Sequence, residues 1–316
     1  MADNILHLDI WPGEWDLPSV DHNCLAALAY CRFSGVPVKV KKARNPWSSP
    51  NGNFPVMRHN DVKETDVNNI FNYLRKQNWG IDSNLSRKQC ADVVAFTAMM
   101  NNRLLPALLH QLWIDNDTYS NVTGPWFTRT AAFPYKFWLA SRLHKEALKK
   151  VYEPHSMANV TNENIDAKIY REAKDCLTYL SQKLGDQDYF FGSTPSSLDA
   201  LVFSYTAPLL KAPLNSNPLT NHLHGFTENL CLHTRRILRE FFPPTQEEIE
   251  AKQKEEANRK AAEAESAENR TRNRDMIITG AFAVMSMAVF VSVNRLLDLS
   301  VFERVLGTND TLDGDI

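Results

Sequence analysis

Apolar and polar positions follow two different patterns along the chain, and the pattern changes near residue 80. In the first part, short apolar runs alternate with segments of helical spacing, and Gly and Pro residues separate them. This pattern predicts strands at residues 5–10, 36–40 and 52–57, and helices at residues 21–33 and 67–74. The order βαβ, then β, then α indicates a small α/β domain with helices packed on a sheet.

Helical spacing dominates from there to residue 242. Ser86 and Gln89 form a capping-box sequence before a long apolar run, and Pro106 inside that run is predicted to kink the helix. Further helices are predicted from Thr161 to Gly185, from a second capping box at Ser196–Asp199, and over residues 219–242, before Pro243 and Pro244. The pattern therefore predicts an all-helical second part.

The chain then changes composition twice. Residues 245–275 are mostly Glu, Lys, Ala, Arg and Asn, so they cannot bury a face, and we interpret them as a solvated spacer, helical or disordered. Met276–Val293 follows as an uncharged apolar run that spans roughly 27 Å as a helix, close to the hydrocarbon thickness of a bilayer. Apolar residues cover every face of this run, which predicts a membrane span that extends to residue 297 if the Arg295 side chain reaches the interface.

The flanking charges predict the orientation of this span. Arg270, Arg272 and Arg274 precede it, whereas the charged residues after Arg295 are mainly acidic. Positive flanks stay in the cytosol, which leaves the bulk of the chain on that side. The N-terminal residues do not have the basic start and apolar run of a signal peptide. The sequence therefore predicts a tail-anchored protein.

Composition narrows the function classes. A hydrophobic content of 43% supports a real core, and a formal net charge of −2 gives no general attraction for nucleic acid. The five cysteines contain no C-x-x-C pair, which favours a reducing compartment and argues against a zinc site. The chain has no P-loop, Rossmann glycine pattern, Ser/His/Asp signature or H-E-x-x-H motif. We predict no catalytic, cofactor-binding or metal site.

Three motifs resemble the glutathione transferase fold, in which a thioredoxin-like βαβ–ββα module is joined to an all-helical domain. Asn53–Met57 resembles the strand that carries the cis-proline of that fold, with Pro55 in the cis position. Asn68–Leu74 resembles the helix that follows. Ser196 and Asp199 resemble the capping motif that nucleates the helical domain. The resemblance implies structural roles for Pro55, Ser196 and Asp199.

A larger set of motifs resembles the metaxin family, in the type that ends in a membrane anchor. These motifs are Gly13–Asp21, Asn45–Pro50, Leu104–Pro106, Phe133–Pro134, Tyr170–Cys176 and Phe190–Ala200. The resemblance implies a non-catalytic subunit of the mitochondrial sorting and assembly machinery, which inserts β-barrel proteins into the outer membrane. It implies as partners the barrel-core subunit, a second metaxin-type subunit, β-barrel precursors and outer-membrane lipid.

The predicted fold class is α+β followed by all-α, in a glutathione-transferase-like arrangement with a single transmembrane helix at the end. The predicted layout is a thioredoxin-like domain at 1–80, a helical domain at 84–242, a spacer at 245–275, an anchor at 276–297, and a tail at 298–316 facing the intermembrane space.

Two alternatives stay open beside this reading. One is an outer-membrane adaptor for motor or organelle-trafficking proteins, a role that the family resemblance also implies. The other is a glutathione-dependent enzyme, which needs a hydroxyl or thiol after the first strand and a polar residue before the second helix. Ser19 is the only hydroxyl in the first of these places, and we expect it to cap the following helix. Val67 stands where the superfamily has serine and offers no hydrogen bond, so the enzyme is disfavoured.

Four other groups of residues have competing interpretations. Cys24 and Cys31 are interpreted as buried small hydrophobes rather than a redox pair. His222 and His224 are expected in a loop, with a metal site as the alternative. A basic cluster is interpreted as a solvated strand edge, with a docking site as the alternative; it contains Lys39, Lys41, Lys42 and Arg44. An aromatic cluster is expected to lie mostly in the core, with part of it free for partners; it contains Trp126, Phe127, Phe133, Tyr135, Phe137 and Trp138.

Overall fold

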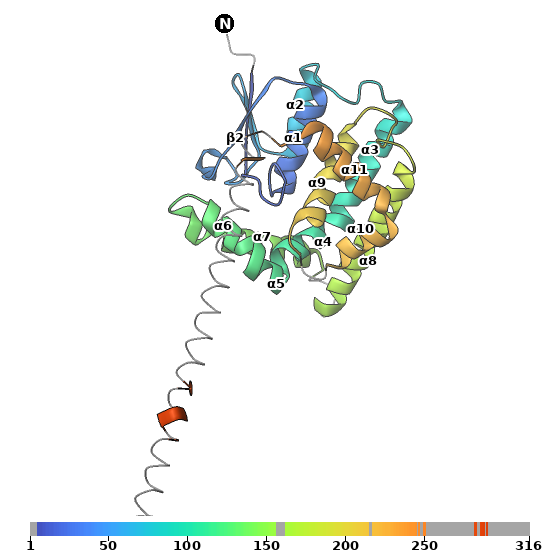
Figure 1. Ribbon diagram of the computed structural model, residues 1–316. Coiled ribbons are helices and arrows are strands. Elements are labelled where there is room, and N and C mark those ends of the chain that lie inside the picture. Colours follow the sequence, from blue (N-terminus) through green and yellow to red (C-terminus); the bar gives the residue numbers. More distant parts are fainter. Residues whose placement is uncertain are drawn as a thin grey trace, which may run out of the picture. The chain divides into compact units, whose positions relative to one another are not determined.

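The computed structural model describes residues 5–155, 162–214 and 217–244, together with a few positions between 246 and 289. The chain divides into two units, Met1–Pro243 and Pro244–Ile316. The first unit contains a mixed β-sheet and a set of helices (Figure 1). The predicted combination of an α/β module with an all-helical part is confirmed for this unit.

The sheet has the strand order β2-β1-β3-β4. Its strands are β1 (Leu6–Ile10), β2 (Val38–Lys42), β3 (Val56–His59) and β4 (Val62–Glu64). β1 runs parallel to β2 and antiparallel to β3, and β3 and β4 form a hairpin. The third strand begins at Val56 rather than at residue 52, because Pro55 has no N–H for the ladder. The strand pattern missed β4, which has only three residues and follows a turn in which Asn60 has φ 52°.

Helices α1 (His22–Ser34) and α2 (Val67–Lys76) pack against the sheet, and α1 also packs on α9 of the helical part (Figure 1). α1 ends at Gly35, whose φ of 66° suits a residue without a side chain. α2 has four buried apolar residues at helical spacing, as the sequence predicts: Val67, Ile70, Phe71 and Leu74. The sheet and these two helices therefore form one layered module.

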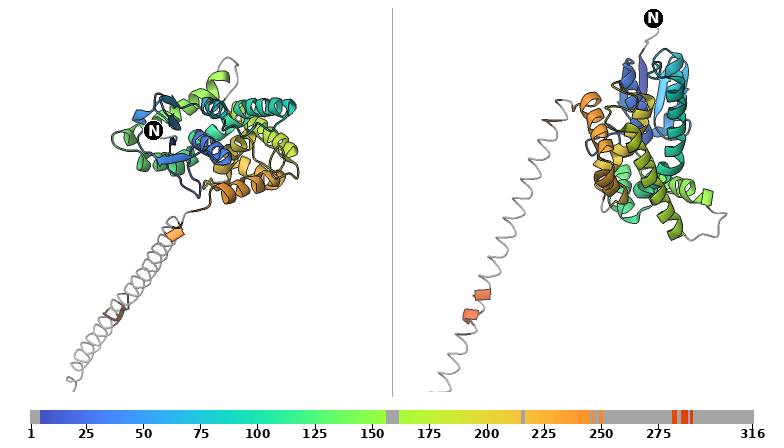
Figure 2. Two further views of the ribbon diagram at one scale, coloured as in Figure 1. Left: turned by 90° about the horizontal axis from the view of Figure 1, so that it is seen from above. Right: turned by 90° about the vertical axis from the view of Figure 1, so that its right-hand side faces the viewer.

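The remaining helices of the first unit run from residue 87 to residue 241. They are α3 (Arg87–Met99), α4 (Leu105–Leu109), α5 (Asn116–Thr118), α6 (Gly124–Thr130), α7 (Leu139–Tyr152), α8 (Asn162–Leu184), α9 (Ser197–Lys211), α10 (Pro218–Phe226) and α11 (Glu228–Phe241). Wide π-helical turns join several of them, at Met100–Leu104, His110–Ile114 and Tyr119–Thr123. Figure 2 shows α8 along one side of this helical part.

The long run after Ser86 stays helical but widens into the π turn Met100–Leu104 just before Pro106, which lies at the second position of α4. One predicted helix boundary is wrong. The predicted helix 219–242 is two helices, because Thr227 leaves the helical region with φ −135° and ψ 48°. Gly185 ends α8 with φ 56°, as predicted, whereas Thr161 lies outside the described residues.

Two hydrophobic clusters hold the first unit together. One cluster combines the sheet, α1 and α2 with side chains from the helical part, including Phe127, Leu139 and Phe203. The other is wholly helical and surrounds α8, where Cys176, Leu177 and Leu180 have no exposed surface. Because the first cluster crosses from the sheet module into the helical part, the two parts share a core and fold as one body.

The second unit is described only at scattered helical positions, where Phe282, Met285, Met287 and Val289 are exposed. Among the residues that the structure describes, no helix is both long and apolar enough to cross a membrane. Most of the predicted span Met276–Val293 lies outside those residues. Also outside them are Arg270, Arg272, Arg274, Arg295, most of the spacer and the tail 298–316.

Candidate functional site

The region after β1 is closed by packing around Trp11. This side chain has no exposed surface, and its Nε1 donates a hydrogen bond to Asn53 Oδ1 at 2.8 Å. Its ring makes edge contacts with Phe54 at 4.9 Å and with Phe127 at 5.3 Å between centroids. The Phe54–Pro55 bond is cis, as predicted. A glutathione transferase would place its thiol-activating group in this region, and here the first residue after β1 is an indole packed between two apolar rings.

Asp21, rather than Ser19, caps α1. The Asp21 carboxylate accepts a hydrogen bond from the Cys24 backbone N–H at 2.9 Å. The Ser19 hydroxyl is buried and accepts a hydrogen bond from the Asp21 N–H at 3.4 Å, so it binds the N-cap residue rather than an N–H of the helix itself. The predicted cap was therefore wrong by two residues, because both residue types suit an N-cap and the apolar pattern does not fix the first turn.

The two cysteines of α1 are buried and unreactive in character, as predicted. Burial raises the pKa of the Cys24 thiol well above its ordinary value, and the nearby Asp21 carboxylate raises it further. Burial also raises the pKa of Cys31 to about 12. A thiol acts as a nucleophile or redox group through its thiolate, so both environments oppose that chemistry.

The start of α2 is occupied by the protein's own carboxylate. Asp66 accepts hydrogen bonds from the backbone N–H groups of Asn68 at 2.9 Å and Asn69 at 3.1 Å. Val67 is 8% exposed and packs into the core below them. A ligand carboxylate at this helix end would lose these donors to Asp66 and would meet a like charge. The arrangement therefore disfavours binding of a γ-glutamyl carboxylate at this helix end.

The capping motif of α9 is the centre of a buried polar network. Asp199 accepts from the Ser196 N–H at 2.8 Å and the Ser196 hydroxyl at 2.6 Å, and from the Phe190 N–H at 3.0 Å. His233 Nε2 lies 2.8 Å from Asp199, and neither side chain is exposed. The network joins the turn before α9 to α11. Ser196 and Asp199 thus have the structural place that the resemblance implied, and His233 was missed because it lies 34 positions after Asp199.

A polar joint connects the sheet module to the helical part. Asp82 accepts hydrogen bonds from the Ser197 N–H at 2.9 Å and the Ser197 hydroxyl at 2.6 Å. Arg75, in the last turn of α2, donates to the same Asp82 carboxylate at 2.8 Å. No sequence motif indicated this joint, because its members are separated by up to 122 positions. It fixes the orientation of the two parts within the first unit.

The aromatic cluster is divided between core and surface. Trp126, Phe127 and Tyr135 are buried, whereas Phe133, Phe137 and Trp138 are 75%, 69% and 44% exposed. Trp47, which is 66% exposed, joins the second set, because its ring lies 5.6 Å from that of Tyr135. Tyr135 in turn lies 4.6 Å from Trp138, and Phe133 lies 6.0 Å from Phe137. Half of the predicted cluster therefore lies in the core, less than expected, and the other half is exposed.

Basic residues surround these exposed rings. Lys136 Nζ lies 5.1 Å from the centre of the Phe137 ring, and Arg142 Cζ lies 5.7 Å from that of Trp138. The Ala132 N–H donates to the Arg44 carbonyl at 3.0 Å, which brings the basic strand next to the aromatic segment. We call Trp47, Phe133, Phe137, Trp138, Arg44 and Lys136 the aromatic–basic patch.

The basic strand β2 is an edge of the sheet, as predicted, and the side chains of Lys39, Lys41 and Lys42 are exposed. His222 and His224 lie on α10 rather than in a loop. His222 Nε2 lies 3.0 Å from the Thr178 hydroxyl, and burial lowers the pKa of His222. Over the described residues, no group of three or more His, Cys, Asp or Glu side chains is placed to hold a metal ion.

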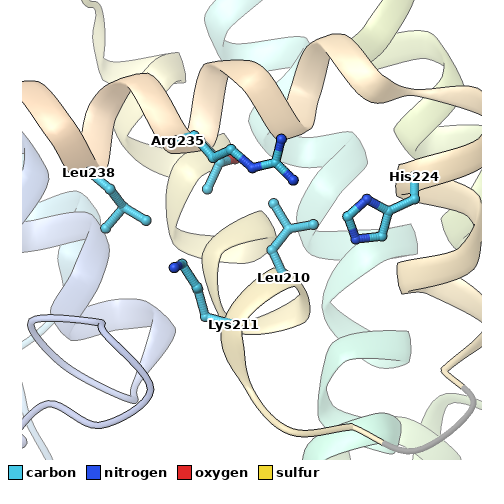
Figure 3. A pocket seen from close by; sticks show the side chains of 6 residues that line it. Leu210, Lys211, His224, Arg235 and Leu238 are labelled. Carbon is cyan, nitrogen blue, oxygen red and sulfur yellow. The ribbon is translucent and has the colours of Figure 1, made fainter.

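A small pocket lies between the end of α9, α10 and α11. Figure 3 shows Arg235 above Leu210, with Lys211 and His224 on either side. The Thr234 hydroxyl on its wall already donates to the Leu230 carbonyl at 2.8 Å, and Lys211 lies 3.5 Å from Asp16. Two polar side chains of this pocket, Thr234 and Lys211, are therefore engaged within the protein, and we take the aromatic–basic patch as the stronger candidate for binding.

Comparison with known proteins decides the family. Residues 24–144 match a family model described as outer mitochondrial membrane transport complex protein, and residues 173–237 match the glutathione S-transferase C-terminal domain. The chain is 40% identical to metaxin-1 of Mus musculus over 284 residues, which cover 89% of this chain and 88% of that protein. The chain belongs to the metaxin family.

Other metaxins extend the match. Metaxin-3 of Danio rerio is 40% identical over 75% of this chain and 76% of its own length. A metaxin-1 homolog of Caenorhabditis briggsae is 31% identical over 95% of this chain and 99% of its own length. Among solved structures, a glutathione S-transferase of Ceriporiopsis subvermispora in complex with glutathione aligns with a TM-score of 0.49 and 14% identity, over 77% of this chain and all of that one. The metaxin relatives span both the sheet module and the helical part, so family and architecture agree.

Proposed function

We propose that this metaxin is a non-catalytic subunit of the sorting and assembly machinery of the mitochondrial outer membrane. The observation that carries the proposal is the match of most of the chain to metaxins and of residues 24–144 to an outer mitochondrial membrane transport complex protein. In this role the chain supports insertion of β-barrel precursors and protein import by binding and positioning.

The closed transferase region supports a role without catalysis. Cys24 is buried with a raised pKa, and Asp66 takes the backbone donors at the start of α2. A transferase-like fold can therefore be retained as a scaffold, since fold and activity are separable. The proposed partners are the barrel-core subunit of the machinery, whose cytosolic mouth the body covers, and a second metaxin-type subunit.

The proposed attachment is the apolar run at residues 276–297, with the bulk of the chain in the cytosol and residues 298–316 in the intermembrane space. Its support is the uncharged stretch Met276–Val293 with three arginines before it. A tag placed after Ile316 is expected to be protected from protease on intact mitochondria and digested after rupture of the outer membrane. Digestion on intact mitochondria would contradict this orientation.

Deletion of the protein tests the proposed role directly. We expect the sorting and assembly complex to shrink on native gels and newly imported barrel precursors to accumulate unassembled. Expression of the Cys24→Ala variant in the deletion background is expected to restore both the complex size and precursor assembly, because no chemistry of this thiol is required. Unchanged complex size and assembly rate would refute the role, and recovery of motor adaptors as the main partners would favour the trafficking alternative.

A further inference from the structure

The aromatic–basic patch has a composition that is unusual for a folded surface. Four of its side chains are large and aromatic, and between 44% and 75% of each is exposed. They come from two segments that are distant in sequence. Trp47 lies in the 3-10 turn Pro46–Ser48, whereas Phe133, Phe137 and Trp138 lie in or beside the 3-10 turn Tyr135–Phe137, and the buried Tyr135 ring lies between Trp47 and Trp138. Scattered exposed apolar residues need no explanation, but a cluster assembled from two segments indicates a contact surface.

The charge of these two segments has a single sign. Residues 39–50 and 129–142 contain seven cationic side chains and no acidic one: Lys39, Lys41, Lys42, Arg44, Arg129, Lys136 and Arg142. Two acidic residues from outside the segments form ion pairs with them, Glu14 at 3.6 Å from Arg129 and Glu146 at 3.5 Å from Arg142. Neither acid is paired with Arg44 or Lys136 among the ion pairs of the described residues. The patch therefore complements a negative surface.

We propose that the aromatic–basic patch docks the folded body onto the headgroup layer of an anionic bilayer. Trp and Phe rings at the headgroup level, with Lys and Arg around them, are the chemistry of interfacial membrane binding. A protein partner fits less well, because lysine is depleted from the cores of protein interfaces, whereas here Lys136 lies over the Phe137 ring within the patch. This contact is additional to the proposed scaffold role and to the proposed C-terminal anchor.

The fold supports such a contact. The link between the two segments is a backbone hydrogen bond from Ala132 to Arg44, and the Arg142 guanidinium donates to the Gly52 carbonyl at 2.5 Å. α6 and α7 flank the aromatic segment (Figure 1), and Phe127 of α6 and Leu139 of α7 belong to the same hydrophobic cluster as the sheet. The exposed rings are thus held on a fixed support, and membrane contact requires no rearrangement of the body.

Vesicle flotation tests the proposal with the full chain. Met285→Asp and Val289→Asp, introduced together, disable insertion of the C-terminal run, so that binding reports the body. We expect this form to bind vesicles of phosphatidylcholine and phosphatidylserine with about tenfold higher affinity than vesicles of phosphatidylcholine alone. We also expect this affinity to fall as the salt concentration rises. Binding that is absent, or that does not depend on phosphatidylserine, would overturn the proposal.

Matched variants locate the binding surface. In that background, Phe133→Ser with Phe137→Ser, and separately Arg44→Gln with Lys136→Gln, are each expected to weaken binding about tenfold. The controls are Phe226→Ser, at another exposed ring, and Arg87→Gln with Lys88→Gln, at another exposed basic pair, and both are expected to bind normally. Circular dichroism verifies the fold of each variant. Equal binding by patch and control variants would place the contact elsewhere.

A second readout keeps the C-terminal run unaltered. The full chain is reconstituted into vesicles that carry brominated lipids, which quench tryptophan fluorescence at the membrane interface. We expect Trp47→Phe with Trp138→Phe to remove most of the quenching that arises in the body, whereas Trp11→Phe at the buried ring leaves it unchanged. If the patch variants lose a protein partner while quenching persists, the patch is a protein interface and the proposal fails. The scaffold role is tested separately by complex assembly.

Discussion

The region after β1 and the aromatic–basic patch differ in the exposure of their side chains. Around Trp11, the rings, the thiol of Cys24 and the polar caps of α1 and α2 are buried or already hydrogen-bonded. In the patch, Trp47 and Phe133 keep 66% and 75% of their surface exposed, beside cations. Groups that can do chemistry are closed off, and groups that can make contacts are exposed. The difference supports the proposed role in binding.

Thiol labelling should show the largest difference. Cys90 is exposed, whereas Cys24, Cys31, Cys176 and Cys231 are buried. In the native protein, we expect one thiol to react quickly with a disulfide reagent and four to react about 10³-fold more slowly, because they must wait for opening of the core. Cys90→Ser should remove the fast phase. A fast phase that persists in this variant would show that at least one of the four buried thiols is accessible, against the comparison.

Two tryptophans provide a matched pair for stability. Trp11→Ala removes a fully buried ring and its hydrogen bond to Asn53, and we expect it to lower the free energy of unfolding by about 3–5 kcal/mol. Trp47→Ala removes an exposed ring, and we expect a change within about 0.5 kcal/mol. Urea unfolding followed by circular dichroism measures both. Similar losses at the two sites would mean that Trp47 is part of the core.

The buried region around Trp11 and α2 could be predicted from the sequence better than the exposed aromatic–basic patch. Cys24, Cys31 and Val67 lie on regular apolar stripes, so their burial follows from helical spacing. The capping motif Ser196–Asp199 was recognisable because its two members are three positions apart. His233 and Asp82, by contrast, meet their hydrogen-bond partners only in the tertiary fold, so no local sequence pattern predicts these contacts.

The aromatic–basic patch depends on contacts between distant segments. Helical spacing cannot decide which rings of the segment Trp126–Trp138 are buried, because that segment includes a helix, an irregular link and a short 3-10 turn. Trp47 joins the patch through Tyr135, which lies 88 positions later in the chain. The aromatic density of the segment was visible in the sequence, but its division between core and surface required the structure.

The stability of the protein at alkaline pH should show the burial of a single thiol, that of Cys31. Burial raises the pKa of Cys31 to about 12 from an ordinary 9.0, so the folded state keeps a proton that the unfolded state loses. This stabilisation is complete below about pH 9 and is lost as the pH rises toward 12, at up to about 1.4 kcal/mol per pH unit for one such thiol. Cys31→Ala should make the decline shallower in urea unfolding series across this range. An unchanged slope would mean that Cys31 is not buried as described.

The smallest effect concerns the closed start of α2. Asp66→Ala removes the cap that binds the N–H groups of Asn68 and Asn69, and we expect a loss of about 1 kcal/mol in the free energy of unfolding, with a smaller loss for Asp66→Asn.

Val67→Ser restores a hydroxyl at the neighbouring position, yet glutathione retention should stay at background, because the Asp66 carboxylate still occupies the donors. Glutathione-affinity chromatography and turnover of chlorodinitrobenzene measure this for the single variant and for Asp66→Ala with Val67→Ser. The double variant is also expected to remain inactive, since Ser19, the only hydroxyl between the first strand and α1, is still buried. Transferase-level turnover by either variant would show that the protein can still bind and activate glutathione, and it would contradict this prediction.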